Sequence, residues 1–510
     1  MSEITSNNKR IAKNTLLLYF RMLFTMVVSL YTSRVVLQAL GVEDFGIYNV
    51  VGTFVAMFSV LSGSLSAAIS RFITFELGTG DNKKLKKVFS SAVTIQIGLF
   101  LVIVLFAETL GLWFLNHKMV IPIERIEAAN WVYQFSILTF GINLISVPYN
   151  AAIIAHERMS AFAYISILEV LGKLFVAFSI TISPIDKLIL YGFLLMLIAL
   201  IIRIVYGYYC KKNFEECTFC FVFDRSLLRE MFGFAGWNMI GSSASILRDQ
   251  GGNVIINLFC GPSVNAARGI AIQVSHVVQG FVTNFMTALN PQIIKSYANG
   301  QKDYMMNLIG RGARFSFYLL FLLSLPIILS TREILHIWLG IVPEHTVSFI
   351  QLSLLFSLHE TLAAPLVTAM LAHGDIKKYQ IIAGGLNMLN LPISYFCLKM
   401  GMMPEFVFIV AILFSFLVQI TRLLLLKQMI HLNIKLFFKE VYVNVLKVSV
   451  VTSIIPLILL YYFEPSFIRF IVVSIISFLC TLLNIYIFGC NKEEREIILS
   501  FISKFTKRAR

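Results

Sequence analysis

Stretches of about 20 predominantly apolar residues recur along this 510-residue chain, and each is long enough to cross the hydrocarbon core of a bilayer as a helix. We count fourteen, at 14–38, 46–72, 88–112, 128–154, 160–182, 187–209, 232–259, 263–290, 312–331, 347–371, 379–399, 405–427, 441–463 and 467–489. Hydrophobic residues make up 58% of the chain and charged residues 14%, too few charges to cover a soluble fold. The sequence therefore predicts an all-α polytopic membrane protein and excludes a secreted disulfide scaffold.

Basic residues are concentrated in alternate connections between these segments. If the N-terminus is cytoplasmic, the inward-facing connections and tails hold 27 of the 42 Lys and Arg residues, and the outward loops hold 6. Lys and Arg favour the cytoplasmic side of a membrane, so both termini are expected in the cytoplasm. This asymmetry accounts for the net charge of +15 without a nucleic-acid partner. Because Arg21 interrupts the first apolar run, we expect a first transmembrane helix there and no cleaved signal peptide.

Two matches at nearly equal spacing indicate an internal repeat. The segment from Pro148 to His156 matches Pro365 to His373 at an offset of 217, and Gly41 and Gly80 recur as Gly261 and Gly300 at an offset of 220. The matched segments fall six helices apart, so the halves are predicted to be parallel six-helix bundles with a substrate site between them near the midplane. The predicted domains are 1–209, the cytoplasmic connection 210–231, 232–430, and a helix pair with a basic tail at 431–510.

Polar residues follow one face of the first two predicted helices in each half. The clearest stripe, which lies within about 80° of one helix face, comprises Asn265, Gly269, His276, Gln279, Thr283, Thr287 and Asn290. Small polar residues also mediate helix packing in membranes, but His, Gln and Asn along a whole helix favour the wall of a hydrated cavity. His276 and Gln279 are therefore candidate substrate-binding residues.

Several basic residues lie inside the predicted spans, where each would cost about 2.5–3.5 kcal/mol at the bilayer centre by insertion scales. Arg21, Arg34, Arg248 and Arg268 belong to the polar-striped helices, and this cationic surplus points to an anionic substrate. Arg203, Arg422 and Lys447 lie near span ends, where we expect their charged groups to snorkel to the interface.

Acidic residues inside the spans are fewer, and they are the candidates for coupling transport to protons or sodium ions. Asp249 adjoins Arg248, so its alternative role is to neutralise that arginine. Glu169 precedes Lys173 by four residues, the favourable order for a structural ion pair. Glu360 follows His359 in the tenth span.

Signatures of enzymes and metal sites are missing from the sequence. The His156-Glu157 and His359-Glu360 pairs lack the second His of a zinc protease motif, and Cys217 and Cys220 have no neighbouring His or second CxxC. Glu43 and Asp44 suit a polytopic sugar transferase, but no connection is long enough to form the outer domain such enzymes carry. We expect no catalytic residue, no metal and no cofactor.

The segment Leu40-Gly41-Val-Glu-Asp-Phe-Gly46-Ile-Tyr48 resembles the "LGxxxFGxY" turn of Wzx-type polysaccharide flippases. These belong to the multidrug/oligosaccharidyl-lipid/polysaccharide exporter superfamily, and the repeated halves, the extra helix pair and the Pro148 segment are similar too. The resemblance implies a V-shaped transporter that turns an undecaprenyl-pyrophosphate-linked oligosaccharide from the cytoplasmic to the periplasmic leaflet of a bacterial inner membrane, for O-antigen or another surface polysaccharide.

The resemblance also suggests site residues and partners. Relatives that flip the peptidoglycan precursor line a cavity with arginines, and by position Arg21, Arg34, Arg248 and Arg268 correspond to them. The expected partners are the lipid-linked oligosaccharide, membrane lipids, a coupling proton or sodium ion, and a polysaccharide polymerase. The alternative is a multidrug exporter of the same superfamily, which typically has twelve helices and acidic residues in its cavities.

Overall fold

The computed structural model describes residues 2–56, 59–117, 121–218, 224–339, 342–464 and 466–496. Every regular element in these ranges is a helix, which confirms the predicted all-α class. Within the described ranges, ten helices are long and apolar enough to cross a membrane, and a bent pair raises the number to eleven. The count of fourteen stays a prediction. Lys118, Cys220 and the basic residues of the tail beyond 496 lie outside the described residues.

Contacts divide the chain into two units, Ile11–Met239 and Ile240–Arg510 with Met1–Arg10. Within the N-terminal unit, α5 packs against α2, α3 and α7, and α6 packs against α7. Its helices are α1 (Ser2–Ala56), α2 (Ser59–Thr79), α3 (Asn82–Phe106), the π-helical turn η1 (Ala107–Gly111), α4 (Leu112–His117), the 3-10 turn η2 (Ile123–Arg125), α5 (Ile126–Ala155), α6 (Met159–Ile182), α7 (Lys187–Asn213) and the 3-10 turn η3 (Glu215–Cys217).

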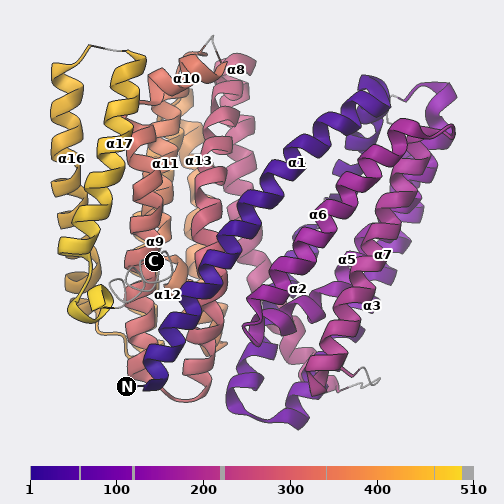
Figure 1. Cartoon of the computed structure of the whole chain (residues 1–510), viewed down its shortest axis with the longest axis horizontal. Helices are drawn as coiled ribbons and strands as arrows, with labels where there is room; N and C mark the ends of the chain where they lie inside the picture. Colours follow the sequence, from indigo (N-terminus) through magenta and orange to yellow (C-terminus); the bar gives the residue numbers. More distant parts are fainter. Residues whose placement is uncertain are drawn as a thin grey trace, which may run out of the picture. The chain divides into compact units, whose positions relative to one another are not determined.

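The C-terminal unit begins within α8 and adds an extra helix pair. In this unit α11, α12 and α17 each pack against α9, and α13 packs against α14. Figure 1 shows α16 and α17 side by side. The elements are α8 (Arg225–Ala298), α9 (Lys302–Leu329), α10 (Thr331–Leu339), α11 (Thr346–Thr361), α12 (Ala364–His373), α13 (Lys377–Lys399), α14 (Phe406–Ile430), α15 (Ile434–Phe437), the π-helical turn η4 (Phe438–Val443), α16 (Asn444–Tyr462), α17 (Phe467–Asn484) and the π-helical turn η5 (Ile485–Gly489).

Two long helices carry matching glycine kinks where the sequence predicts loops between spans. Gly41 in α1 has φ 78° and ψ 172°, and Gly261 in α8 has φ 82° and ψ 177°. This combination is open essentially only to glycine, because any Cβ would clash with the backbone. The connections expected after residues 38 and 259 are therefore sharp kinks.

Further pairs of backbone features recur at the offsets of the internal repeat. Gly80 and Gly300 have φ values of 76° and 70°, and Glu157 and Gly374, the residues after the matched histidines, have φ values of 57° and 96°. Similarity between the two halves therefore extends from short sequence matches to backbone geometry.

The matched prolines lie in helices of different continuity. Pro148 is inside the continuous helix α5, whereas Pro365 follows a 40° bend between α11 and α12. A proline ring clashes with the carbonyl four residues earlier, and in the C-terminal unit that residue is Thr361, the last of α11. Glu360 is the second-to-last residue of α11, one position before Thr361.

Candidate functional site

A cavity of about 330 Å³ lies within the C-terminal unit. Its walls come from both arms of α8, on either side of the Gly261 kink, and from α11, α13 and α14. Five of the residues predicted to form the site line it together, namely Arg248, Asp249, Arg268, His276 and Gln279. We call this the charged cavity.

Arg268 is the most buried charge of this cavity, with 5% of its surface exposed. Its Nε donates to Asn253 Oδ1 at 2.8 Å, and a terminal nitrogen donates to the backbone carbonyl of Asp249 at 3.0 Å. The guanidinium lies 5.1 Å from the ring centroid of Phe408, a favourable cation–π position. Among the described residues, its hydrogen bonds thus go to neutral oxygens, so they fix the arginine without cancelling its charge.

Gly252 provides the space that this arginine occupies. A Cβ at Gly252 would lie 2.5 Å from a terminal nitrogen of Arg268 and 2.9 Å from its central guanidinium carbon. Both distances are too short for non-bonded contact. The absence of a side chain at Gly252 therefore lets the guanidinium approach the backbone closely.

Arg248 is the second cation of the charged cavity, and it has an acidic neighbour. Its Nε donates to Asp249 Oδ1 at 2.9 Å, and its guanidinium lies 4.9 Å from the Phe356 ring centroid. The Arg248 side chain is 16% exposed and the Asp249 side chain 56%. Because water screens an exposed ion pair, Asp249 neutralises Arg248 only weakly.

The rest of the wall combines uncharged polar groups with apolar side chains. Gln279 Nε2 donates to Ser357 Oγ at 2.7 Å, and Ser275 Oγ donates to Ser353 Oγ at 2.8 Å. The side-chain amide nitrogen of Asn390 is buried and makes no hydrogen bond with the described part of the chain. A buried donor without a partner is costly, so this wall suits a ligand that brings acceptor oxygens.

Asn253, Asn390 and Phe356 are among the lining residues that the sequence prediction leaves out, because it relies on charged residues and on polar stripes along the first two helices of each half. Asn253 lies four residues after Asp249, so helical periodicity places both on one face. Asn390 is a single amide in an apolar span, and Phe356 is an aromatic residue in a different apolar span. The sequence around each of them fits a cavity wall and ordinary helix packing equally well. Only the tertiary structure brings them together.

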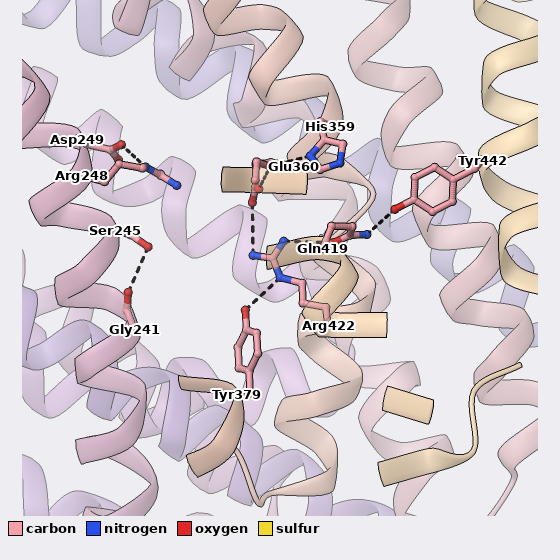
Figure 2. A network of polar contacts seen from close by, with 11 residues as sticks. Gly241, Ser245, Arg248, Asp249, His359, Glu360, Tyr379, Gln419, Arg422 and Tyr442 are labelled. Atoms are coloured by element: carbon pink, nitrogen blue, oxygen red, sulfur yellow. Dashed lines mark hydrogen bonds and ion pairs between the residues drawn. The ribbon is translucent and has the colours of Figure 1, made fainter. Parts of the chain in front are cut away.

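Glu360 belongs to a polar network next to the break between α11 and α12 (Figure 2). Ser415 Oγ donates to Glu360 Oε1 at 2.5 Å, and His359 Nδ1 lies 2.6 Å from the same Ser415 oxygen. Since the single Ser415 proton is directed to Glu360, His359 must donate from Nδ1. Arg422 approaches the other Glu360 oxygen at 3.6 Å.

Arg422 is the centre of this network, and the expectation that it snorkels is wrong. Only 6% of the surface of Arg422 is exposed. Its Nε donates to Tyr379 Oη at 3.2 Å, and a terminal nitrogen donates to Gln419 Oε1 at 3.2 Å. Gln419 in turn donates to Tyr442 Oη at 2.9 Å (Figure 2). Burial of an arginine here is possible because neighbouring helices supply a carboxylate and neutral oxygens.

The other predicted site residues lie in the N-terminal unit. Arg21 donates to Ser166 Oγ at 3.4 Å, and its guanidinium lies 4.5 Å from the Phe162 ring centroid. Arg34 is exposed. Glu169 forms an ion pair with Lys173 at 2.6 Å, with side chains 34% and 47% exposed, which is the structural alternative considered for this acid.

Asp44, considered for a transferase, is bound by Arg125. The guanidinium donates to both Asp44 oxygens, at 2.8 and 2.5 Å, and to Asp186 at 2.5 Å. Burial raises the pKa of Asp186, but the hydrogen bond from Arg125 and those from the backbone N–H groups of Ile189 and Leu188 outweigh it, so the pKa lies below its usual value. This charge cluster joins the start of α7 to η2 and α1, which gives Asp44 a structural role.

The equivalent place in the C-terminal unit has a histidine in place of the arginine. His345 Nδ1 lies 2.6 Å from Glu405 Oε1, to which Ser348 Oγ also donates at 2.7 Å. Burial raises the pKa of Glu405, but these two hydrogen-bond partners lower it by more, so it lies below its usual value.

Comparison with known proteins agrees with this architecture. Residues 10–296, more than half of the chain, match the family described as polysaccharide biosynthesis protein. A curated relative, the uncharacterized membrane protein EpsK of Bacillus subtilis (strain 168), is 22% identical over 328 residues. The match covers 62% of this chain and 63% of that relative.

Several solved transporters share the fold. They include a multidrug resistance MATE family transporter of the MOP superfamily in an outward-facing conformation (12% identity, TM-score 0.69) and a MATE transporter in a bent conformation (12%, 0.72). A third is a MOP superfamily transporter from Pyrococcus furiosus (13%, 0.66). Each alignment covers 83% of this chain and 96% of the other chain.

The family match confirms the membership that the Leu40–Tyr48 segment suggested, and the structural likeness confirms the fold. The chain is a multi-pass membrane protein of the polysaccharide biosynthesis protein family, with the fold of MOP superfamily transporters.

Proposed function

We propose that this protein moves an undecaprenyl-pyrophosphate-linked oligosaccharide from the cytoplasmic to the periplasmic leaflet of a bacterial inner membrane. The observation that carries the proposal is the charged cavity, in which Arg268 is 5% exposed and makes its hydrogen bonds to neutral oxygens. A buried cation of this kind favours an anionic ligand, because the ligand supplies the missing charge where solvent screening is weak.

A pyrophosphate suits the guanidinium groups of Arg248 and Arg268. Guanidinium can bind two oxygens of a phosphate at once, whereas an ammonium group acts as a point charge. The amide nitrogen of Asn390 and the side chains of His276 and Gln279 offer further polar contacts on the same wall. Arg21 and Arg34 remain predicted contributors from the N-terminal unit.

The polarity of the cavity also favours this substrate over the cationic drugs expected of a multidrug exporter. Among the described residues that line the cavity, a cationic drug would meet two arginines, and Asp249, which is exposed, is the one acidic side chain to attract it. The solved transporter from Pyrococcus furiosus is itself described as having a binding pocket of reverse polarity that suggests a different function. Pocket charge can therefore separate functions within one shared fold.

The coupling ion is part of the proposal. Asp249 lies in the charged cavity, and Glu360 lies at the helix break with its side chain 28% exposed. Either carboxylate could exchange a proton or sodium ion as the cavity changes access. In vesicles, Asp249→Asn should abolish the dependence of transport on the ion gradient if Asp249 is the coupling group, and Glu360→Gln should do so if Glu360 is.

Deleting the gene tests the function directly. We expect complete lipid-linked repeat units to accumulate in the inner leaflet while surface polysaccharide is lost. Arg248→Ala and Arg268→Ala should each insert stably yet weaken substrate binding about ten- to a hundredfold, because a charge-assisted hydrogen bond is worth about 2–3 kcal/mol. Lys at either position should restore export only partly.

Arg229→Ala is the matched control, since Arg229 is an exposed arginine of the same helix outside the charged cavity. Normal export by both cavity variants would contradict the proposal. Normal polysaccharide with increased sensitivity to cationic dyes in the deletion strain would identify a multidrug exporter, and incomplete repeat units would identify a transferase.

A further inference from the structure

The N-terminal unit contains a cavity of its own, of about 220 Å³. Its lining includes Tyr48 and Gly52 from α1, and Ser136, Thr139, Phe140 and Asn143 from α5. We call it the neutral cavity, because none of its lining residues carries a charge at neutral pH. Tyr48 is the last residue of the segment that resembles the polysaccharide flippases.

The neutral cavity is the repeat counterpart of the charged cavity. Adding the offset of 220 to Tyr48 and Gly52 gives Arg268 and Ile272, and adding 217 to Ser136 gives Ser353. All three of these residues line the charged cavity. The duplicated fold therefore forms a cavity at the same place in each half.

The two cavities differ in the charge of their lining residues. Tyr48 takes the place of the buried Arg268. Asn143, which lines the neutral cavity, corresponds in sequence to Glu360, which is not among the residues that line the charged cavity. An ion gains no opposite charge in such a pocket and would lose its hydration there. The neutral cavity therefore selects an uncharged ligand.

Polar groups within the neutral cavity define that ligand further. The hydroxyl oxygen of Thr139 is buried and makes no hydrogen bond with the described residues. Ser136 and Asn143 add a hydroxyl and an amide to the lining. A hydrocarbon chain would leave these groups without hydrogen-bond partners, which is costly where they are buried, so the ligand needs hydroxyl groups of its own.

Aromatic rings complete the lining. Tyr48 and Phe140 both line the neutral cavity, and Tyr48 packs edge-on against Tyr191 with centroids 4.8 Å apart. That contact limits the movement of the Tyr48 ring. Apolar surfaces combined with a few placed polar groups are the usual composition of a specific small-molecule site, and a sugar ring matches it with its CH faces and hydroxyl edges.

We infer that the neutral cavity is a saccharide-binding site, which recognises sugar residues of the substrate while the charged cavity binds its phosphates. This inference rests on the proposed function, and it assigns the choice of saccharide to a second site. The experiment must therefore separate recognition of the sugar from recognition of the lipid pyrophosphate.

Protection of single cysteines from alkylation by a bound ligand can distinguish these two kinds of recognition. Ser136→Cys reports on the neutral cavity and His276→Cys, at an exposed lining residue, on the charged cavity, each in a functional variant without the seven native cysteines. Alkylation by N-ethylmaleimide, which is small and uncharged, is measured on purified protein in nanodiscs. The two probes are the lipid-linked saccharide that accumulates in the deletion strain and bare undecaprenyl pyrophosphate.

We expect the lipid-linked saccharide to slow alkylation at both positions at least fivefold. Bare undecaprenyl pyrophosphate should slow it at His276→Cys but change it less than twofold at Ser136→Cys. Equal protection of Ser136→Cys by both lipids, or none by either while His276→Cys is protected, would overturn the saccharide site and leave the proposed function intact. If neither lipid protects either position, both fail.

Filling the neutral cavity gives an independent test. A Cβ at Gly52 would meet no atom within 4 Å, and the equivalent position of the other half already holds Ile272. Gly52→Ile should therefore fold and fill the cavity, reducing export at least tenfold while bare undecaprenyl pyrophosphate still protects His276→Cys. Gly98→Ile is the control, because Gly98 is equally open but exposed on α3 and does not line this cavity. Export by Gly52→Ile equal to that by Gly98→Ile would overturn the inference.

Discussion

The charge of Arg268 is not compensated by its hydrogen bonds, because they go to neutral oxygens of Asn253 and Asp249. Gly252 leaves the space that the guanidinium occupies. Gly252→Ala would place a methyl group 2.5 Å from a terminal nitrogen of Arg268, so the guanidinium must leave Asn253 or the Asp249 carbonyl. Alanine stabilises helix interiors by about 0.5–1 kcal/mol over glycine. We therefore expect export to fall about tenfold without a loss of thermal stability, both measured on the same variant.

The control for this substitution is Gly269→Ala in the same helix, where a Cβ meets nothing within 4 Å. It should leave export unchanged. Equal export by the two alanine variants would show that the position of Arg268 is not critical.

At the scale of helices, the matched kinks are the clearest feature. Alanine at Gly41 or Gly261 must adopt a backbone conformation that costs about 1–3 kcal/mol, or the helix must straighten. We expect either substitution to lower the melting temperature in detergent by several degrees and to reduce export. Gly98→Ala, in regular helix, should do neither.

The two kinks lie in separate units, so their effects on stability should add. A double variant that is no less stable than the single variants would contradict this view.

The cluster around Arg125 gives a pH-dependent prediction for helix ends. Because the folded-state pKa of Asp186 lies below its usual value of 3.8, its stabilising effect is complete above that pH and is lost as the pH falls through the folded-state pKa. Asp186→Asn should therefore lower the melting temperature at pH 7, and the difference from wild type should vanish in stronger acid. Glu124→Gln, at a neighbouring exposed carboxylate, is the control and should leave the melting temperature at pH 7 unchanged.

Helices were the most predictable level of this structure. Runs of apolar residues locate them well, because a membrane requires each spanning segment to satisfy its own backbone hydrogen bonds. The sequence predicts loops at Gly41 and Gly261, where the structure has kinks, because glycine within polar sequence is typical of both. The sequence does not predict the burial of Arg422, because its partners Glu360 and Tyr379 lie 62 and 43 residues away, beyond any local pattern.

At the scale of the whole molecule, orientation is the property to test. The charge split of 27 to 6 predicts that Lys84 is cytoplasmic and Lys118 periplasmic. Single cysteines at these positions should react with a membrane-impermeant maleimide from opposite faces of the membrane. Labelling of both from one side would overturn the topology and the parallel relation of the halves.

Part of the candidate site was predictable at this scale as well. The excess of arginine in polar helices indicated an anionic ligand, and the structure brings Arg248 and Arg268 to one cavity with His276 and Gln279. The neutral cavity was not predictable, because serine, threonine and tyrosine in a membrane helix look like ordinary packing residues. Its position becomes evident only when the duplicated backbones are compared.

Duplication with divergence at Tyr48 and Arg268 has a consequence for how such transporters evolve. If one half binds the phosphates that the substrates share and the other half recognises the sugars in which they differ, mutations can change the transported saccharide without weakening phosphate binding. A bacterium under selection by an immune system or by phages could then change its surface polysaccharide through substitutions of a few uncharged residues around Tyr48. Selection would meanwhile preserve the arginines of the other half.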